Sequence, residues 1–111
     1  MDNKLQKLDS DIYSFVINTV SFLKTLQKKG IQNAATTSLA KLTKSLNSKF
    51  NIFYEKPENQ TEIKNVLTSL LEQIKFILIK NFEEEGMDII HEKADLLIDA
   101  DKLQAEIDEI L

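Results

Sequence analysis

The chain has 111 residues, of which 42% are hydrophobic and 29% are charged, and its formal net charge is −4. This composition is typical of a folded globular domain and excludes a disordered or fibrous chain. Only two glycines and one proline occur, which favours long helices over turn-rich β structure, and the absence of cysteine excludes disulfides and thiolate metal sites.

The first predicted helix spans about residues 4–29. Its apolar residues recur every three or four positions, with Thr19 filling the one gap, which indicates a face turned to a core. Lys28 and Lys29 are followed by Gly30, the order expected at a helix C-terminus, because glycine readily adopts the left-handed conformation. The core stripe consists of Leu5, Leu8, Ile12, Phe15, Phe22 and Leu26.

The second predicted helix spans about residues 36–54, and its core stripe consists of Leu39, Leu42, Leu46, Phe50 and Phe53. A break follows at Pro57, the only proline. Asn59 and Glu62 then have the spacing of a capping box, with Asn in place of Ser or Thr. We therefore expect the third helix to begin near residue 60.

The third predicted helix spans about residues 60–84, and its core stripe consists of Ile63, Leu67, Leu70, Ile74 and Ile77. We expect Gly86 to end this helix and Asp88 to cap a fourth helix over residues 88–110. Lys93 interrupts the apolar stripe of the fourth helix, and we expect its ammonium group to reach water.

Gly30, Pro57 and Gly86 thus separate four amphipathic segments of similar length. Short connections between such segments favour neighbours that run antiparallel. The sequence predicts an all-α protein, an antiparallel up-down-up-down four-helix bundle that occupies residues 1–111 as one domain.

Two of these helices carry large apolar residues outside their core stripes. In one interpretation these residues lie under a neighbouring helix, and in the other they form an oligomer interface, because each large side chain that is buried contributes about 1.5–3 kcal/mol. Glu72 lies on the same outer face of the third helix, either solvated or fixing the register of such an interface. The predicted interface residues are Tyr13, Ile17 and Val20 on the first helix and Phe76, Ile79 and Phe82 on the third.

Charge is distributed unevenly along the chain. Residues 1–54 hold eight Lys and three Asp, whereas residues 55–111 hold six Lys and fifteen acids. Either the two halves compensate each other within the bundle, or the basic half binds a partner. Lys41, Lys44 and Lys49 are the candidate nucleic-acid contacts. No Arg is present to read bases, so we expect nucleic-acid binding to be weak or absent.

The sequence shows no catalytic constellation. His91 is the only histidine, and Asp88 precedes it at the three-residue spacing used by di-metal bundles. Such sites need two of these motifs and further inward carboxylates, so we expect no metal, no cofactor and no enzymatic activity.

No segment suggests contact with a membrane. The longest apolar run, residues 76–79, is far shorter than the roughly 20 residues of a membrane span. Residues 1–7 are polar and do not resemble a secretory signal. We expect a cytoplasmic protein.

The arrangement resembles the bacterial four-helix-bundle family of S23 type, whose members are encoded in intervening sequences of 23S ribosomal RNA genes. The resemblance rests on the Lys-rich end of the first helix, residues 45–52 (SLNSKFNI), the Leu- and Ile-rich third helix, residues 85–88 (EGMD) and the acidic last helix. It implies a small bundle that forms ring-like homo-oligomers, with relatives that include basic accessory proteins of diversity-generating retroelements. It implies no catalytic residues.

We therefore expect a non-enzymatic, self-associating interaction or scaffold module, with a further protein partner as an additional expectation. Two alternatives remain open at this point. One is a nucleic-acid-binding accessory protein that uses the Lys face of the first two helices. The other is a small acidic inhibitor or immunity protein that masks a basic partner.

Overall fold

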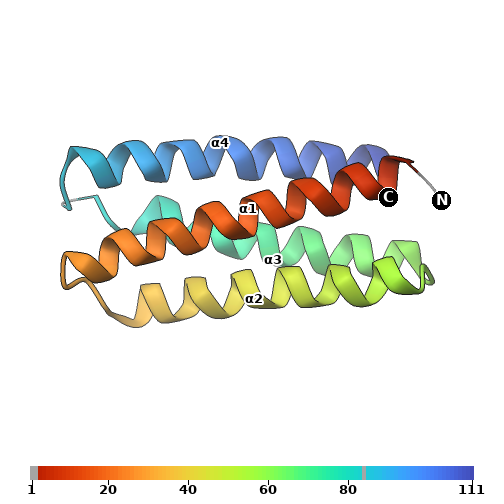
Figure 1. Cartoon of the computed structure of the whole chain (residues 1–111), viewed down its shortest axis with the longest axis horizontal. Coiled ribbons are helices and arrows are strands. Elements are labelled where there is room, and N and C mark those ends of the chain that lie inside the picture. Colours follow the sequence, from red (N-terminus) through yellow and green to blue (C-terminus); the bar gives the residue numbers. More distant parts are fainter. Residues whose placement is uncertain (1–2, 84) are drawn as a thin grey trace.

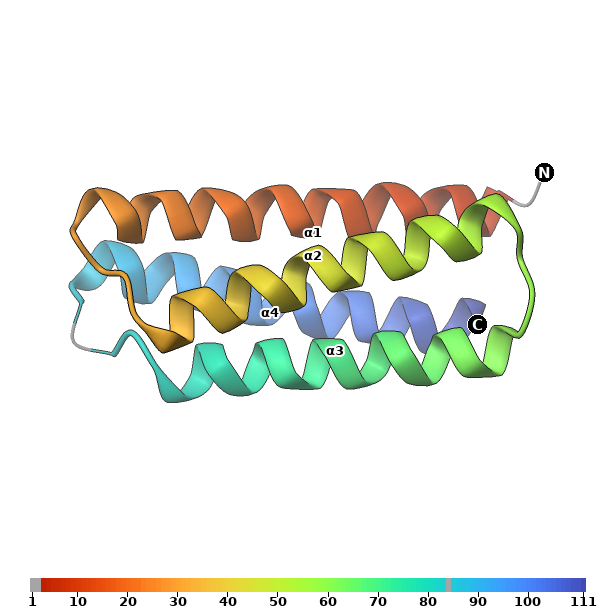
Figure 2. The ribbon, with the colours of Figure 1, turned by 90° about the horizontal axis from the view of Figure 1, so that it is seen from below.

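The computed structural model describes residues 3–83 and 85–111, and these residues form four helices without a strand (Figure 1). The helices are α1 (Asn3–Lys28), α2 (Ala34–Glu55), α3 (Gln60–Lys80) and α4 (Met87–Ile110). Each helix runs antiparallel to the one before it (Figures 1 and 2). The predicted all-α four-helix bundle is confirmed.

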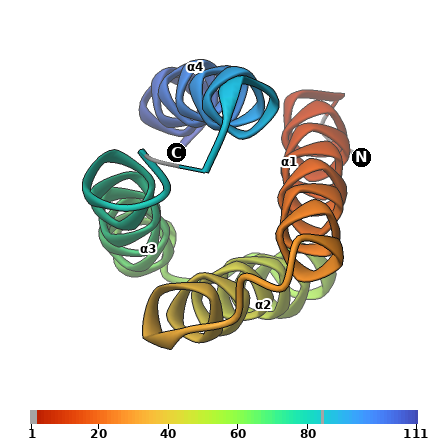
Figure 3. The same cartoon turned by 90° about the vertical axis from the view of Figure 1, so that its left-hand side faces the viewer.

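The helices occupy the corners of a square in chain order (Figure 3). α1 packs against α2 and α4, and α3 packs against the same two helices, whereas in the described residues no Cα atom of α1 lies within 8 Å of one in α3, and none of α2 within 8 Å of one in α4. The bundle measures 43 × 21 × 19 Å. The square packing decides which outer faces adjoin, because each helix shares a surface only with its two neighbours.

The core is built from the apolar stripes of all four helices. Among the described residues the only buried polar side chains are those of Thr19 and Thr43. Their hydroxyl groups donate to the carbonyl oxygens of Phe15 (2.9 Å) and Leu39 (2.7 Å), one turn earlier in the same helix. Both hydroxyls are therefore satisfied without a partner from another helix.

The end of α1 follows the sequence prediction. Gly30 has φ +79°, in the left-handed region. Its amide donates to the carbonyl of Gln27, and the amide of Ile31 donates to that of Leu26, both at 2.9 Å. This is the Schellman pattern, and the half-buried Ile31 packs against the core beyond it.

α3 begins at Gln60, as predicted, but the caps at the helix starts differ from the prediction. The capping box expected at Asn59 is absent: Asn59 has φ 56° and makes no side-chain cap hydrogen bond. A side-chain cap requires extended backbone, which Asn33 has, and Asn33 forms a complete capping box with Thr36 at the start of α2. α2 accordingly begins at Ala34, two residues before the predicted start.

α3 ends at Lys80, four residues before the predicted end at residue 84, which itself lies outside the described residues. The Asn81 side-chain amide donates to the carbonyl of Ile77 at 2.8 Å and caps the last turn. The ammonium group of Lys93 donates to the Asn81 carbonyl at 2.9 Å. The expectation that Lys93 reaches only water is therefore wrong, because this carbonyl lies where the helix has stopped and needs a donor.

Phe82 was expected on the outer face of the third helix, and this placement is wrong. Its φ of +68° turns the chain out of the helical path. The side chain is only 6% exposed and packs edge to face on Phe22, with ring centroids 5.5 Å apart. Phe82 therefore closes one end of the core and is unavailable to an outer interface.

α4 begins at Met87, with Gly86 rather than Asp88 as the capping residue. Asp88 lies in the first turn, and its carboxylate accepts a hydrogen bond from the Lys29 ammonium at 2.7 Å. Gly86 has φ +104°, a conformation that other residues rarely adopt. The ion pair joins the α1–α2 connection to the start of α4.

The contrast between two phenylalanines near this end gives a test of the core. We expect Phe82→Ala to lower the free energy of unfolding by about 3–5 kcal/mol, because it leaves a cavity beside Phe22. Phe76→Ala removes an exposed ring and should change the free energy by less than about 0.5 kcal/mol. Urea denaturation at protein concentrations where the chain is monomeric measures both. Equal costs would contradict the assigned positions.

Candidate protein-interaction surface

The predicted interface residues do not form one surface. Tyr13, Ile17 and Val20 are exposed on α1, and Phe76 and Ile79 are exposed on α3. Because α1 and α3 occupy diagonal corners, the two sets lie on opposite sides of the bundle (Figure 3). The helical spacing predicted correctly that these five side chains point away from the core. The spacing within one helix does not show which helices lie side by side in the bundle.

A shallow groove between α2 and α3 holds one of these residues. Its apolar lining comes from Leu42 on α2 and from Phe76 and Ile77 on α3, and Lys41 and Glu72 stand at its rim. Phe76 is 62% exposed. Glu72, expected on the outer face, is exposed there as well.

A second groove lies along the same pair of helices, toward the α2–α3 connection. It is lined by Ile52 and Lys49 on α2 and by Ile63 and Val66 on α3. Ile52 is 69% exposed, more than any other large apolar side chain in the described residues. Ile52 was not predicted as an interface residue from the sequence. The feature that indicates it is that it is the one apolar residue on an otherwise polar, Lys-bearing face of the helix.

The three candidate nucleic-acid lysines lie on this side or next to it. Lys41 and Lys49 line the two grooves, and Lys44, also exposed, lies between them on α2, three residues after Lys41. None of the three forms an ion pair with another described residue. We call Lys41, Lys44, Lys49, Ile52 and Phe76 the α2 surface.

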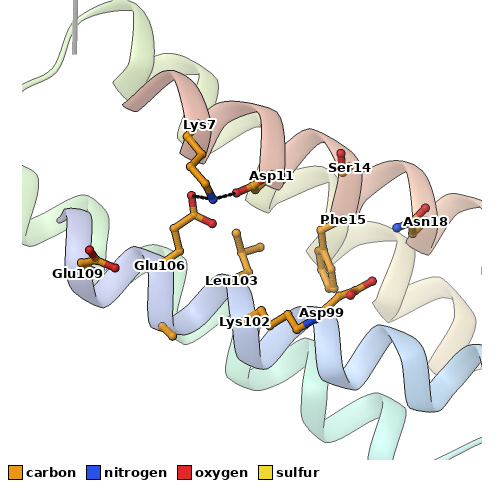
Figure 4. A pocket seen from close by; sticks show the side chains of 11 residues that line it. Lys7, Asp11, Ser14, Phe15, Asn18, Asp99, Lys102, Leu103, Glu106 and Glu109 are labelled. Atoms are coloured by element: carbon orange, nitrogen blue, oxygen red, sulfur yellow. Dashed lines mark hydrogen bonds and ion pairs between the residues drawn. The ribbon is translucent and has the colours of Figure 1, made fainter. Parts of the chain in front are cut away.

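The seam between α1 and α4 has a different chemistry (Figure 4). The Lys7 ammonium lies 2.8 Å from a carboxylate oxygen of Asp11 and 3.3 Å from one of Glu106. Asp99 and Glu109 also line this hollow. The seam is therefore lined by four carboxylates, next to the apolar side chains of Phe15 and Leu103.

The pKa values of Asp11 and Glu106 are shifted in opposite directions. Burial between the helices raises the pKa of Glu106, and the neighbouring Asp11 carboxyl raises it further. Hydrogen bonds with Glu106 and with Lys7 lower the pKa of Asp11. The pKa of the Lys7 ammonium is raised, first by its hydrogen bond with Asp11 and then by that with Glu106.

The helices differ strongly in charge. α4 holds eight acids and two lysines, a net charge of −6, whereas α2 holds three lysines and one acid, a net charge of +2. Ion pairs to α4 come from Lys7 on α1, from Lys29 after it, and from Lys75 on α3, 3.1 Å from Asp101. Compensation between the two halves of the chain therefore comes from Lys7 on α1 and from Lys29 after it, but not from the diagonal helix α2.

The described residues contain no group of three His, Cys, Asp or Glu side chains placed to hold a metal ion. His91 is exposed on α4. None of the described helices has the length and apolar character to cross a membrane. The α2 surface and its grooves are thus the most distinctive feature outside the core.

Comparison with protein-family models, curated proteins and solved structures gives no match to this chain. The resemblance to the S23-type family therefore stays a prediction, and function has to be argued from the surface itself.

The opposite shifts at Asp11 and Glu106 give a pH test. The folded-state pKa of Glu106 lies above its ordinary value of 4.5, so its ionisation destabilises the fold as the pH rises past that value. We expect Glu106→Gln to be at least as stable as the unmodified protein at neutral pH, despite the loss of an ion pair. Thermal unfolding across a pH series measures this.

Asp11→Asn is the matched control. The folded-state pKa of Asp11 lies below 3.8, so its charge stabilises the fold at neutral pH and that contribution is lost as the pH falls through the folded-state pKa. The variant should be less stable than the unmodified protein at neutral pH and equal to it in strong acid. The same sign of change in both variants would contradict the assignment.

Proposed function

We propose that the protein is a non-enzymatic helical interaction module that self-associates through the grooves between α2 and α3. The observation that carries this proposal is the exposure of Phe76 and Ile52, two of the three most exposed large apolar side chains, along one pair of helices. A groove between two helices with apolar residues at both ends is a surface that accepts a further helix.

The energetics require more than these two residues. Full burial of each contributes about 1.5–3 kcal/mol, whereas association costs at least about 4 kcal/mol in lost translational and rotational freedom. The half-buried Leu42, Val66 and Ile77 add apolar surface to the contact. We therefore expect association to be weak and reversible. The resemblance to the S23-type family implies that the associated copies form a closed, ring-like homo-oligomer.

Two matched substitutions test the proposal. Phe76→Lys should give a folded monomer, because it places a charge in the groove. Tyr13→Lys changes an aromatic side chain of similar exposure, 59%, on α1 and should leave the assembly intact. Sedimentation at high micromolar concentration, compared with the chain mass of 12.7 kDa, measures both.

Two results would contradict the proposal. A monomeric unmodified protein would remove self-association altogether. Dissociation by Tyr13→Lys but not by Phe76→Lys would assign the contact to the stripe of Tyr13, Ile17 and Val20 on α1 instead.

A second candidate function is nucleic-acid binding, favoured by the exposure of Lys41, Lys44 and Lys49 without ion-pair partners among the described residues. Contact with about three phosphates gives a log–log salt slope near −3 and little affinity at physiological salt. The chain contains no Arg to read bases.

Fluorescence anisotropy with duplex DNA and structured RNA decides between the two functions. We expect weak, sequence-independent binding that is lost by about 150 mM salt. Sub-micromolar, sequence-dependent binding at that salt concentration would make nucleic acid the main partner of the α2 surface.

A further inference from the structure

The grooves between α2 and α3 need a partner of definite chemistry, and the bundle itself carries a surface that fits. The outward side of α4 presents the exposed residues Met87, Ala94, Ile98 and Ala105, spaced seven, four and seven positions apart and therefore on one face. Asp95 and Glu109, also exposed, lie beside them. We call these six residues the α4 surface.

Resting on the proposed self-association, we propose that the α4 surface of one copy docks against the α2 surface and grooves of a second copy. Copies of the chain then associate head to tail. The contact pairs the most acidic helix with a basic helix, and it sets the exposed Ile98 and Met87 against Ile52 and Phe76.

Charge complementarity selects this pairing over the symmetric ones. Two α2 surfaces face to face bring Lys41, Lys44 and Lys49 against the same three lysines, on helices that each carry a net charge of +2. Glu58, Glu62 and Glu72 also line the grooves, on the α2–α3 connection and on α3. Two α4 surfaces oppose helices that each carry a net charge of −6. Like charges across an interface are repulsive, so the contact between unlike surfaces is favoured.

The charges needed for the contact are not used inside the bundle. α2 and α4 lie on diagonal corners, and no Cα atom of one comes within 8 Å of a Cα atom of the other. Asp95 and Glu109 form no ion pair with a described residue, and the same holds for the three lysines of the α2 surface. Docking therefore creates new ion pairs without breaking existing ones.

The shapes and lengths also match. Ala94 and Ala105 leave room for a second backbone on either side of Ile98, and Ser38 and Ser69 are small residues in the lining of the groove. α2 and α4 have 22 and 24 residues, about 33 and 36 Å of helix. A contact along that length covers several hundred Å² per partner, at the lower end of the range for specific complexes, about 600–800 Å².

A charge swap tests the proposal. Lys41→Glu with Lys44→Glu makes both surfaces of a chain acidic, and Asp95→Lys with Glu109→Lys reverses both charges of the α4 surface and changes the net charge of α4 from −6 to −2. Each double variant alone should self-associate at least about tenfold more weakly than the unmodified protein. An equimolar mixture should recover association, because every contact between the two variants again joins opposite charges.

Lys24→Glu with Lys28→Glu is the matched control. It makes the same change in net charge as Lys41→Glu with Lys44→Glu, but on exposed α1 residues outside both surfaces. It should leave self-association unchanged. Circular dichroism checks that every variant is folded. Sedimentation of each variant and of the mixture gives the dissociation constants.

The outcomes separate the two proposals. A monomeric unmodified protein contradicts self-association itself. An unmodified protein that associates while both charge-swapped variants keep its affinity overturns only the head-to-tail contact. If both variants associate more weakly but their mixture stays monomeric, the head-to-tail contact is overturned as well. In that case, loss of DNA binding by the Lys41→Glu, Lys44→Glu variant alone would assign the α2 surface to nucleic acid.

Discussion

The square packing of the four helices is the constraint on which the rest of the structure depends. Each helix buries one stripe against two neighbours, and the three short connections fix the order of the helices around the bundle as the order of the chain. α4 is thereby placed beside α1 and α3, which supply lysines to it, and diagonal to α2, which does not. The separate acidic and basic surfaces follow from this order and from the charge of each helix.

The end of the bundle that holds Gly30 and Gly86 shows how a short connection is made specific. α1 ends before Gly30, which places Lys29 outside the helix. The Lys29 ammonium group donates a hydrogen bond to the carboxylate of Asp88 at the start of α4. At the same end Phe82 closes the core, and Lys93 bonds to the carbonyl left free where α3 stops. An ion pair, a buried ring and a charged hydrogen bond thus tie three helix ends together.

The parts of the fold that could be predicted are those that depend only on the helical repeat of apolar residues. The stripes of α1 and α4 are buried largely as their three- and four-residue spacing indicates, because every core residue of a regular helix faces the same neighbours. Phe82 was placed on the outer face with Phe76 and Ile79 because it follows Ile79 by three residues, yet the chain leaves the helix at Asn81. Periodicity does not register a left-handed residue, so it assigned Phe82 to the wrong side.

The caps and the candidate surface depended on information that spacing lacks. Asn33 and Asn59 each precede a residue suited to a capping box, and only the backbone conformation set by the connections separates them. Likewise, Phe76 and Tyr13 both lie outside the core stripe of their helix, so the spacing does not distinguish between them. That Phe76 lies in a groove with Leu42 while Tyr13 lies on the diagonal helix follows from the packing of α2 against α3.

The acidity of α4 is costly to the isolated chain, and this cost bears on function. Asp88 and Glu92, and again Asp95 and Asp99, stand four positions apart on one helix, where like charges repel. The lysines supplied by α1, α3 and the α1–α2 connection pair with Glu106, Asp101 and Asp88 and leave Asp95 without an ion pair. A basic surface docked on α4 lowers this repulsion in the bound state only. The charge that weakens the free bundle therefore adds to the affinity for a basic partner, and the α2 surface of another copy is such a partner.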